Sequence, residues 1–83
     1  MKKTMENQFI TSDFYTAVFL LAKEYKLVGI NKSDPRRFRF IFEDQEGRAK
    51  LLEGFFNGKA KVEPRKFVNA IKELKSLMYS DAI

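Results

Sequence analysis

Apolar positions recur at helical spacing in three segments of the chain. Residues 14–25 repeat apolar side chains at intervals of three and four for three turns, which is typical of one face of a helix. A second segment of this kind covers 49–56 and ends before Gly58, a residue that tolerates the positive φ of a helix end. A third covers 64–78, where Pro64 suits the first helical position because its missing N–H would be unpaired there. The pattern therefore predicts three helices.

The remaining apolar segments have the spacing of strands. Residues 8–11 form a short candidate strand, and 26–31 and 37–43 form two more. Residues 32–35 between the latter two have turn chemistry, which predicts a hairpin. The predicted order is β-α-β-β-α-α, a single α+β domain with a three-stranded sheet and helices packed on one face. If the first two strands are neighbours, the helix between them must cross over right-handed. Residues 1–7 are polar and are expected to form a frayed tail.

The third predicted strand separates two chemistries by its period of two. Phe38, Phe40 and Phe42 share one face, whereas Arg37 and Arg39 share the other. An aromatic strand face can stack nucleic-acid bases. Large apolar residues in a small domain are nevertheless more often core. We therefore expect the three Phe side chains to pack under the helices and the arginines to lie on the outer face of the sheet.

Basic residues gather in two places along the chain. Arg36, in the predicted turn, joins the two strand arginines as a surface that positions phosphates without reading sequence. A second group surrounds the start of the last helix, and the N-terminal end of a helix attracts anions. The alternative is an ordinary solvated surface, in which Glu43 dilutes the first group and Glu63 pairs with the second. The candidate nucleic-acid contacts, for DNA or RNA, are Arg36, Arg37, Arg39, Lys59, Lys61, Arg65 and Lys66.

The composition bears on function chiefly through the residue types that are absent. The 83 residues carry a net charge of +5 but contain neither Cys nor His. The chain therefore has no thiolate nucleophile, no zinc–thiolate site and no side chain that ordinarily titrates near neutral pH. Among its carboxylates, Asp13 and Asp44 are explained by helix capping and Asp34 by a turn. We predict a non-enzymatic protein with no catalytic residue, no metal ligand and no cofactor.

Hydropathy and the N-terminal residues bear on the compartment. No apolar run approaches the roughly 20 residues of a spanning helix. Polar residues at 6–8 follow the basic start, where a signal peptide would be apolar. A chain without Cys is compatible with a reducing compartment. These features favour a soluble cytoplasmic protein with no membrane partner.

The helices also carry more apolar residues than a single-sided stripe requires. Phe19, Leu20, Phe55, Phe56 and Val68 are the excess. Such residues either complete a three-helix layer or form a patch for a partner. A homodimer through the helices would bury this patch symmetrically.

Several short motifs, taken in order, resemble those of a known family. They are Thr11-Ser12-Asp13-Phe14, Leu20-Leu21-Ala22-Lys23, Pro35-Arg36-Arg37, Phe40-Ile41-Phe42-Glu43-Asp44, Phe56-Asn57-Gly58-Lys59-Ala60, Val62-Glu63-Pro64 and Leu74-Lys75-Ser76-Leu77-Met78-Tyr79. The ordered set is similar to a family of short uncharacterised domains, a domain of unknown function of prokaryotes and their mobile elements. The similarity runs from about Phe9 to Tyr79. It implies a stand-alone small domain, and it supplies neither an activity nor site residues.

The sequence thus leads to two hypotheses for function. The first is a non-enzymatic binding module associated with nucleic acid through the basic sheet face. The second is a protein-interaction or homodimerisation domain without nucleic-acid contact. The fate of the Phe face and the placement of the two basic groups decide between them.

Overall fold

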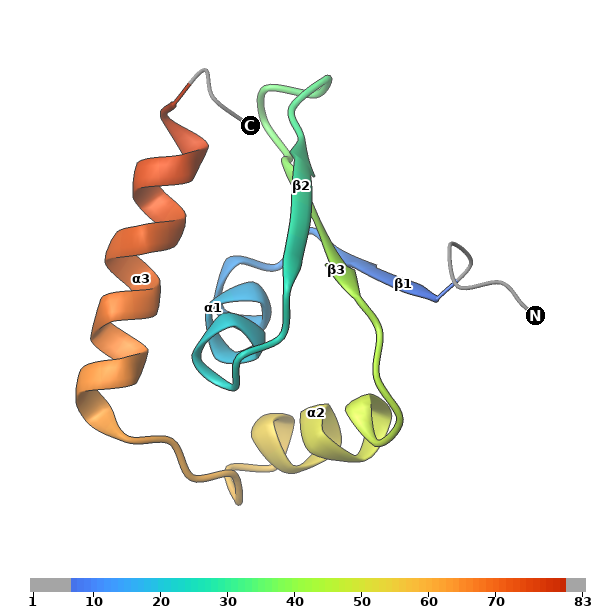
Figure 1. Ribbon diagram of the computed structural model, residues 1–83, viewed down its shortest axis with the longest axis vertical. Coiled ribbons are helices and arrows are strands. Elements are labelled where there is room, and N and C mark those ends of the chain that lie inside the picture. The colour runs from blue at the N-terminus through green and yellow to red at the C-terminus, as the bar shows by residue number, and fades with distance from the viewer. Residues whose placement is uncertain (1–6, 81–83) are drawn as a thin grey trace.

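The computed structural model describes residues 7–80, and in them a three-stranded antiparallel sheet packs with three helices (Figure 1). The predicted α+β class and element order are confirmed. The expected frayed tail falls largely on residues 1–6, outside the described part of the chain. Asn7 is described, and its carbonyl accepts a hydrogen bond from the Asp44 N–H at 2.8 Å. In chain order the elements are β1 (Gln8–Thr11), α1 (Phe14–Ala22), β2 (Leu27–Asn31), β3 (Arg39–Glu43), α2 (Arg48–Phe56) and α3 (Pro64–Met78).

The central strand of the sheet is β3, the last of the three in sequence. The strand order is β1-β3-β2, and both outer strands pair with β3 antiparallel. Phe9 of β1 and Leu27 of β2 lie on either side of Phe42. The β2–β3 hairpin is confirmed, and its register shifts between Leu27 and Gly29. Because β1 and β2 are not neighbours, the condition for a right-handed crossover between adjacent strands does not arise.

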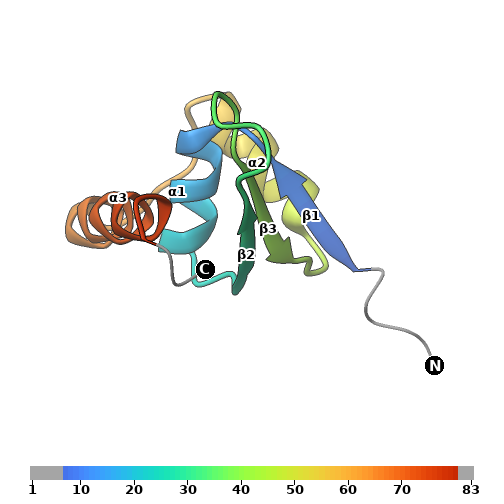
Figure 2. The ribbon, with the colours of Figure 1, turned by 90° about the horizontal axis from the view of Figure 1, so that it is seen from above.

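Helices α1 and α3 form successive layers on the sheet (Figure 2), whereas α2 lies at its end (Figure 1). Figure 2 shows α1 between the sheet and α3, and α2 lies beyond the end of β3 in Figure 1. The Phe55 ring of α2 stacks on the Phe19 ring of α1, with centroids 4.4 Å apart. Burial of apolar surface between these layers is the main stabilising contribution. The buried core consists of Ala17, Val18, Phe19, Leu20, Ala22, Tyr25, Ile30, Phe40, Phe42, Leu52, Ala70 and Leu74.

The ends of α1 follow from local chemistry. Asp13 is the N-cap, and its carboxylate accepts hydrogen bonds from the N–H and the hydroxyl of Thr16 at 2.8 and 2.6 Å. The helix stops at Ala22, short of the predicted end, because Glu24 takes a positive φ of 68°. The chain then turns so that Tyr25 is buried outside the helix.

The start of α2 differs from the sequence-based expectation. Its N-cap is Gly47, with a φ of 90° and no side-chain capping bond. Asp44 therefore does not cap this helix. The predicted stop at Gly58, with a φ of 73°, is confirmed. Within residues 7–80, no helix is both long enough and apolar enough to span a bilayer.

Candidate nucleic-acid interface

The aromatic stripe of β3 belongs to the core. Phe42 is fully buried and Phe40 nearly so, and Phe38 is half-buried against the same cluster. The Phe40 and Phe42 rings are enclosed in the core and offer no exposed face to a base. The interpretation as core packing is confirmed, and Phe40 and Phe42 are not available to stack bases.

Of the two arginines expected on the outer face of the third strand, only Arg39 lies in that strand. Arg39 begins β3 and is exposed beside Asn31. Arg37 precedes the strand, and its Nε donates a hydrogen bond to Ser12 Oγ at 3.0 Å. Arg36 is exposed in the turn. The prediction of one shared strand face is wrong, because the β2–β3 turn continues through Arg37 and the strand begins two residues later.

Two of these arginines border a hollow at one end of the molecule. The hollow has a volume of about 250 Å³ and lies between the β2–β3 turn and the C-terminal end of α3. Apolar and aromatic side chains form most of its wall, and the Ser12 hydroxyl adds a polar group. Tyr79 at its edge is 81% exposed, so one face of its ring is open to a ligand. The lining residues are Ser12, Phe14, Pro35, Arg36, Arg37, Phe38, Phe40, Met78 and Tyr79.

A single lysine holds the two sides of the hollow together. Lys32 Nζ donates hydrogen bonds to the carbonyls of Leu77 at 3.1 Å and Ser80 at 2.6 Å. These carbonyls lie at the C-terminal end of α3, where the helix dipole favours a cation. The ammonium also lies 5.9 Å from the centroid of the Phe38 ring. Lys32 therefore joins the start of the β2–β3 turn to the C-terminal end of α3.

The second basic group is exposed but partly neutralised. Lys59, Lys61, Arg65 and Lys66 are all exposed around the start of α3. Lys66 Nζ pairs with a carboxylate oxygen of Glu24 at 3.3 Å. A neighbouring hollow of about 510 Å³ contains carboxylates as well as lysines in its wall. Anions are therefore repelled as well as attracted at this hollow.

Glu63, expected to pair with the second basic group, has another role. Its carboxylate caps α3 by accepting a hydrogen bond from the backbone N–H of Lys66 at 3.0 Å. This bond satisfies one of the free N–H groups at the helix start. The same end of the helix is thereby less available to an external anion.

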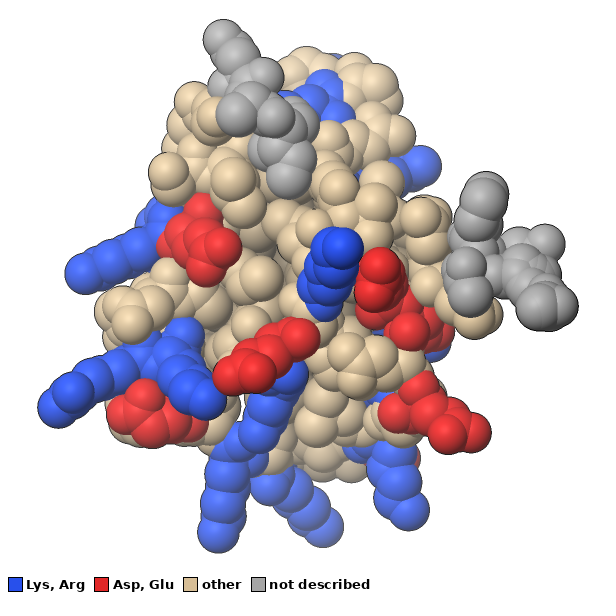
Figure 3. Space-filling model, viewed as in Figure 1, with Lys and Arg blue, Asp and Glu red and all other residues tan. Residues whose placement is uncertain are grey.

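The two basic groups do not form one surface. The β2–β3 turn lies at the upper end of the molecule in Figure 1, and the α2–α3 connection lies at the lower end. In Figure 3 blue side chains gather in the lower half of the face, and red carboxylates are interspersed among them. A ligand at the arginine hollow is therefore separated from the second group by the length of the sheet.

The apolar excess of the helices does not form one patch either. Phe19 and Leu20 are fully buried in α1, so they belong to the layer between the sheet and α3. Phe56 is 66% exposed and borders a groove beside β1, whereas Val68 borders a separate shallow hollow on α3. Of the two expected alternatives, completion of the helix layer applies to Phe19 and Leu20, whereas Phe56 and Val68 border separate hollows.

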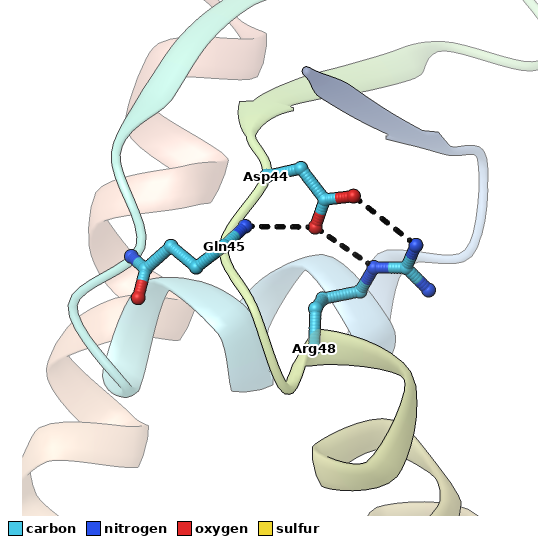
Figure 4. A network of polar contacts seen from close by, with 3 residues as sticks. All are labelled: Asp44, Gln45 and Arg48. Carbon is cyan, nitrogen blue, oxygen red and sulfur yellow. Dashed lines mark hydrogen bonds and ion pairs between the residues drawn. The ribbon is translucent and has the colours of Figure 1, made fainter.

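Asp44 and Arg48 form the best-defined polar network of the fold (Figure 4). Arg48 Nε and Nη2 donate to the two carboxylate oxygens of Asp44 at 3.1 and 3.2 Å, and the Gln45 N–H donates at 2.9 Å. The Arg48 hydrogen bond, against a smaller opposing effect of burial, holds the pKa of Asp44 below its usual 3.8. The guanidinium also stacks on Phe9, 3.9 Å from the ring centroid. Arg48 thus joins α2 to β1, and its charge is already balanced.

This network predicts a loss of stability in acid. Because its folded pKa lies below the unfolded value, Asp44 stabilises the fold fully above pH 3.8 and loses this effect as the pH falls through the folded value. We expect the unfolding free energy of the Asp44→Asn variant to fall less steeply between about pH 5 and 2. The Arg48→Met variant should show the same flattening, because it removes the main cause of the shift. Urea unfolding across this range measures both, and wild-type steepness in either variant would contradict the assignment.

Comparison with known proteins supplies a family and no activity. The model of a family described as a domain of unknown function, DUF5659, matches residues 6–80. The chain belongs to this family, which confirms the expected similarity to a domain of unknown function. Searches of curated proteins and of solved structures gave no significant match.

Proposed function

We propose that the domain is a non-enzymatic binding module that holds single-stranded nucleic acid at the arginine hollow. One observation supports it above all. Two exposed guanidinium groups, from Arg36 and Arg37, and the exposed Tyr79 ring border the same apolar-walled hollow. Arginine side chains bind phosphate oxygens through paired hydrogen bonds, and an exposed aromatic ring stacks an unpaired base. Such a combination fits a flexible strand whose bases can turn outward better than it fits a duplex.

The chemistry of the site favours backbone contact with little sequence reading. Arg36 is exposed, and its backbone N–H bonds to Asp34 Oδ1 at 3.0 Å, which steadies the turn. Arg37 uses its Nε on Ser12 and retains its terminal nitrogens for a ligand. The net charge of +5 adds a long-range attraction to polyanions. We therefore expect affinity to depend strongly on salt and weakly on base identity.

The test is a binding measurement with charge-matched variants. Fluorescence anisotropy follows labelled DNA and RNA, single- and double-stranded, at about 50 to 200 mM salt. The variant Arg36→Ser/Arg37→Ser removes two charges at the hollow, whereas Lys59→Ser/Lys61→Ser removes two at the opposite end. We expect the arginine variant to weaken single-strand binding about tenfold or more, because charge-assisted contacts to phosphate are lost. The lysine variant should lose only a few-fold.

A second variant separates base stacking from phosphate attraction. Tyr79→Ala leaves the charge unchanged and should weaken binding about fivefold or more, because each base–aromatic stack contributes appreciably. Circular dichroism confirms that each variant is folded. Equal losses in the two double variants would mean that charge alone attracts the strand, and the hollow would not be the site. Binding confined to the lowest salt, or a preference for duplexes, would also overturn the proposal.

A further inference from the structure

The outer edge of β1 presents free backbone hydrogen-bonding groups. In an antiparallel pair, alternate residues direct both N–H and C=O at the partner strand. The Asp44 N–H bonds to the Asn7 carbonyl at 2.8 Å, so Asn7, the residue before β1, directs its backbone groups at β3. In the register that follows, every second residue does the same. Phe9 and Thr11 therefore face β3 with their backbone groups. Gln8 and Ile10 direct theirs away from the sheet, where β1 has no neighbouring strand among the described residues.

The side chains beside this edge are apolar and exposed. Ile10 is 51% exposed on the open face of the sheet, next to Ile41 of β3. On the other face a groove of about 810 Å³ runs between β1 and α2, with Phe9, Phe55 and Phe56 in its wall. Exposed apolar side chains thus lie beside β1 on both faces of the sheet. An added strand would bury apolar side chains on each face as well as pair its backbone.

We propose that this edge pairs with the same edge of a second copy of the chain, which makes a six-stranded sheet across a two-fold axis. Side chains opposite each other in a sheet lie on the same face. Odd-numbered residues of one copy must therefore pair with odd-numbered residues of the other, and even with even. A two-fold axis at Phe9 sets Gln8 of one copy opposite Ile10 of the other. Each such pair exchanges two backbone hydrogen bonds, so all the outward groups of both residues are satisfied by an identical strand.

The distribution of charge favours pairing of two copies through the edge at β1 rather than through the edge at β2. Positions 8–11 of β1 carry no charge, so two copies with a net charge of +5 meet at an uncharged seam. Natural sheets protect edges against pairing with charges and irregularities. At the opposite edge the register of β2 shifts between Leu27 and Gly29, and the exposed, charged Lys26 directly precedes the strand. β2 is therefore protected, and β1 is open to pairing.

The first test is the oligomeric state of matched variants. Sedimentation velocity from about 1 μM to 1 mM should show a monomer–dimer equilibrium in the wild type. Ile10→Lys places two like charges at the seam and should raise the dissociation constant about tenfold or more. Val28→Lys makes the same change at the other edge, where Val28 is 46% exposed, and should leave the constant unchanged. A monomer at every concentration, or equal effects of the two variants, would overturn the proposal.

The second test fixes the register by cross-linking. The chain contains no cysteine, so a single introduced thiol is unique. An axis at Phe9 sets the two copies of this position about 4.5 Å apart between Cα atoms, which suits a disulfide. Phe9→Cys should therefore cross-link under mild oxidation, whereas the two copies of Ile10→Cys would be more than about 7 Å apart and should not. Cross-linking of Ile10→Cys alone, or of neither variant, would overturn the register. This inference is independent of nucleic-acid binding, because the edge of β1 does not border the arginine hollow.

Discussion

Replacing Phe42 by Ala should lower the unfolding free energy by about 3–5 kcal/mol, the usual effect of truncating a buried aromatic side chain. Phe42 is completely buried, since 0% of its surface is accessible to solvent. It lies at the centre of the sheet, between Phe9 and Leu27 on the neighbouring strands. A domain of 83 residues is typically stable by roughly 4–12 kcal/mol. The substitution would therefore remove a large part of the total stability.

Urea unfolding followed by circular dichroism measures this effect, with Phe38→Ala as the matched control. Phe38 has the same side chain and lies four residues earlier in the same alternating pattern. It is only half-buried, at the edge of the hollow. Its truncation should reduce the unfolding free energy by less than half as much. Similar losses for the two variants would mean that the core does not centre on Phe42. If Phe42→Ala still unfolds like the wild type, the packing of β3 under the helices is wrong.

The elements could be predicted from the sequence because their signals are local. The three-residue and four-residue repeats of α1 and α3 reflect burial of one side of each helix. The period of two in β3 reflects the same burial on one face of the sheet. Pro64 marks the start of α3 and Gly58 the end of α2, because each has a backbone preference that suits that position. Each of these signals depends on residues within a few positions of one another, so the sequence displays them directly.

The strand order and the candidate site depend on contacts that are distant in sequence. The position of β3 between β1 and β2 follows from pairing across more than 25 residues, for which the sequence carries no local signal. Arg36 and Arg37 were predicted as candidate residues, but Tyr79 was not, although all three border the hollow. Lys32 was assigned only to a turn, because its acceptors at and just beyond the end of α3 lie more than 40 residues away.

Boundaries failed where a turn or a cap competed with the periodic pattern. Arg37 fits the alternation of β3, yet the turn retains it, since its N–H bonds to the Asp34 carbonyl at 3.0 Å. Asp44 stands where an N-cap is expected, but the Arg48 guanidinium is a stronger partner than the free N–H groups of α2. In both cases the local pattern was correct in kind. The competing contact moved the boundary by one to three residues.

Replacing Lys32 by Met should lower the unfolding free energy by about 1–3 kcal/mol, because two charge-assisted hydrogen bonds to the end of α3 are lost. The substitution keeps most of the aliphatic stem and removes the ammonium that joins the hairpin turn to Leu77 and Ser80. The last turn of α3 would then separate from the β2–β3 turn. Because the hollow lies between these two segments, single-strand affinity should fall together with stability.

Lys26→Met is the matched control for Lys32→Met, since it removes one positive charge from the other end of β2. The Lys26 side chain is 74% exposed, and its ammonium lies 3.9 Å from Glu43, so the pair contributes at most about 1 kcal/mol. Both variants lose the same charge, so long-range attraction to nucleic acid falls equally in both. A larger loss of stability and of affinity in Lys32→Met would therefore come from the geometry of the hollow. Equal behaviour of the two variants would mean that Lys32 contributes only its charge, and that the separation of the turn from α3 does not depend on it.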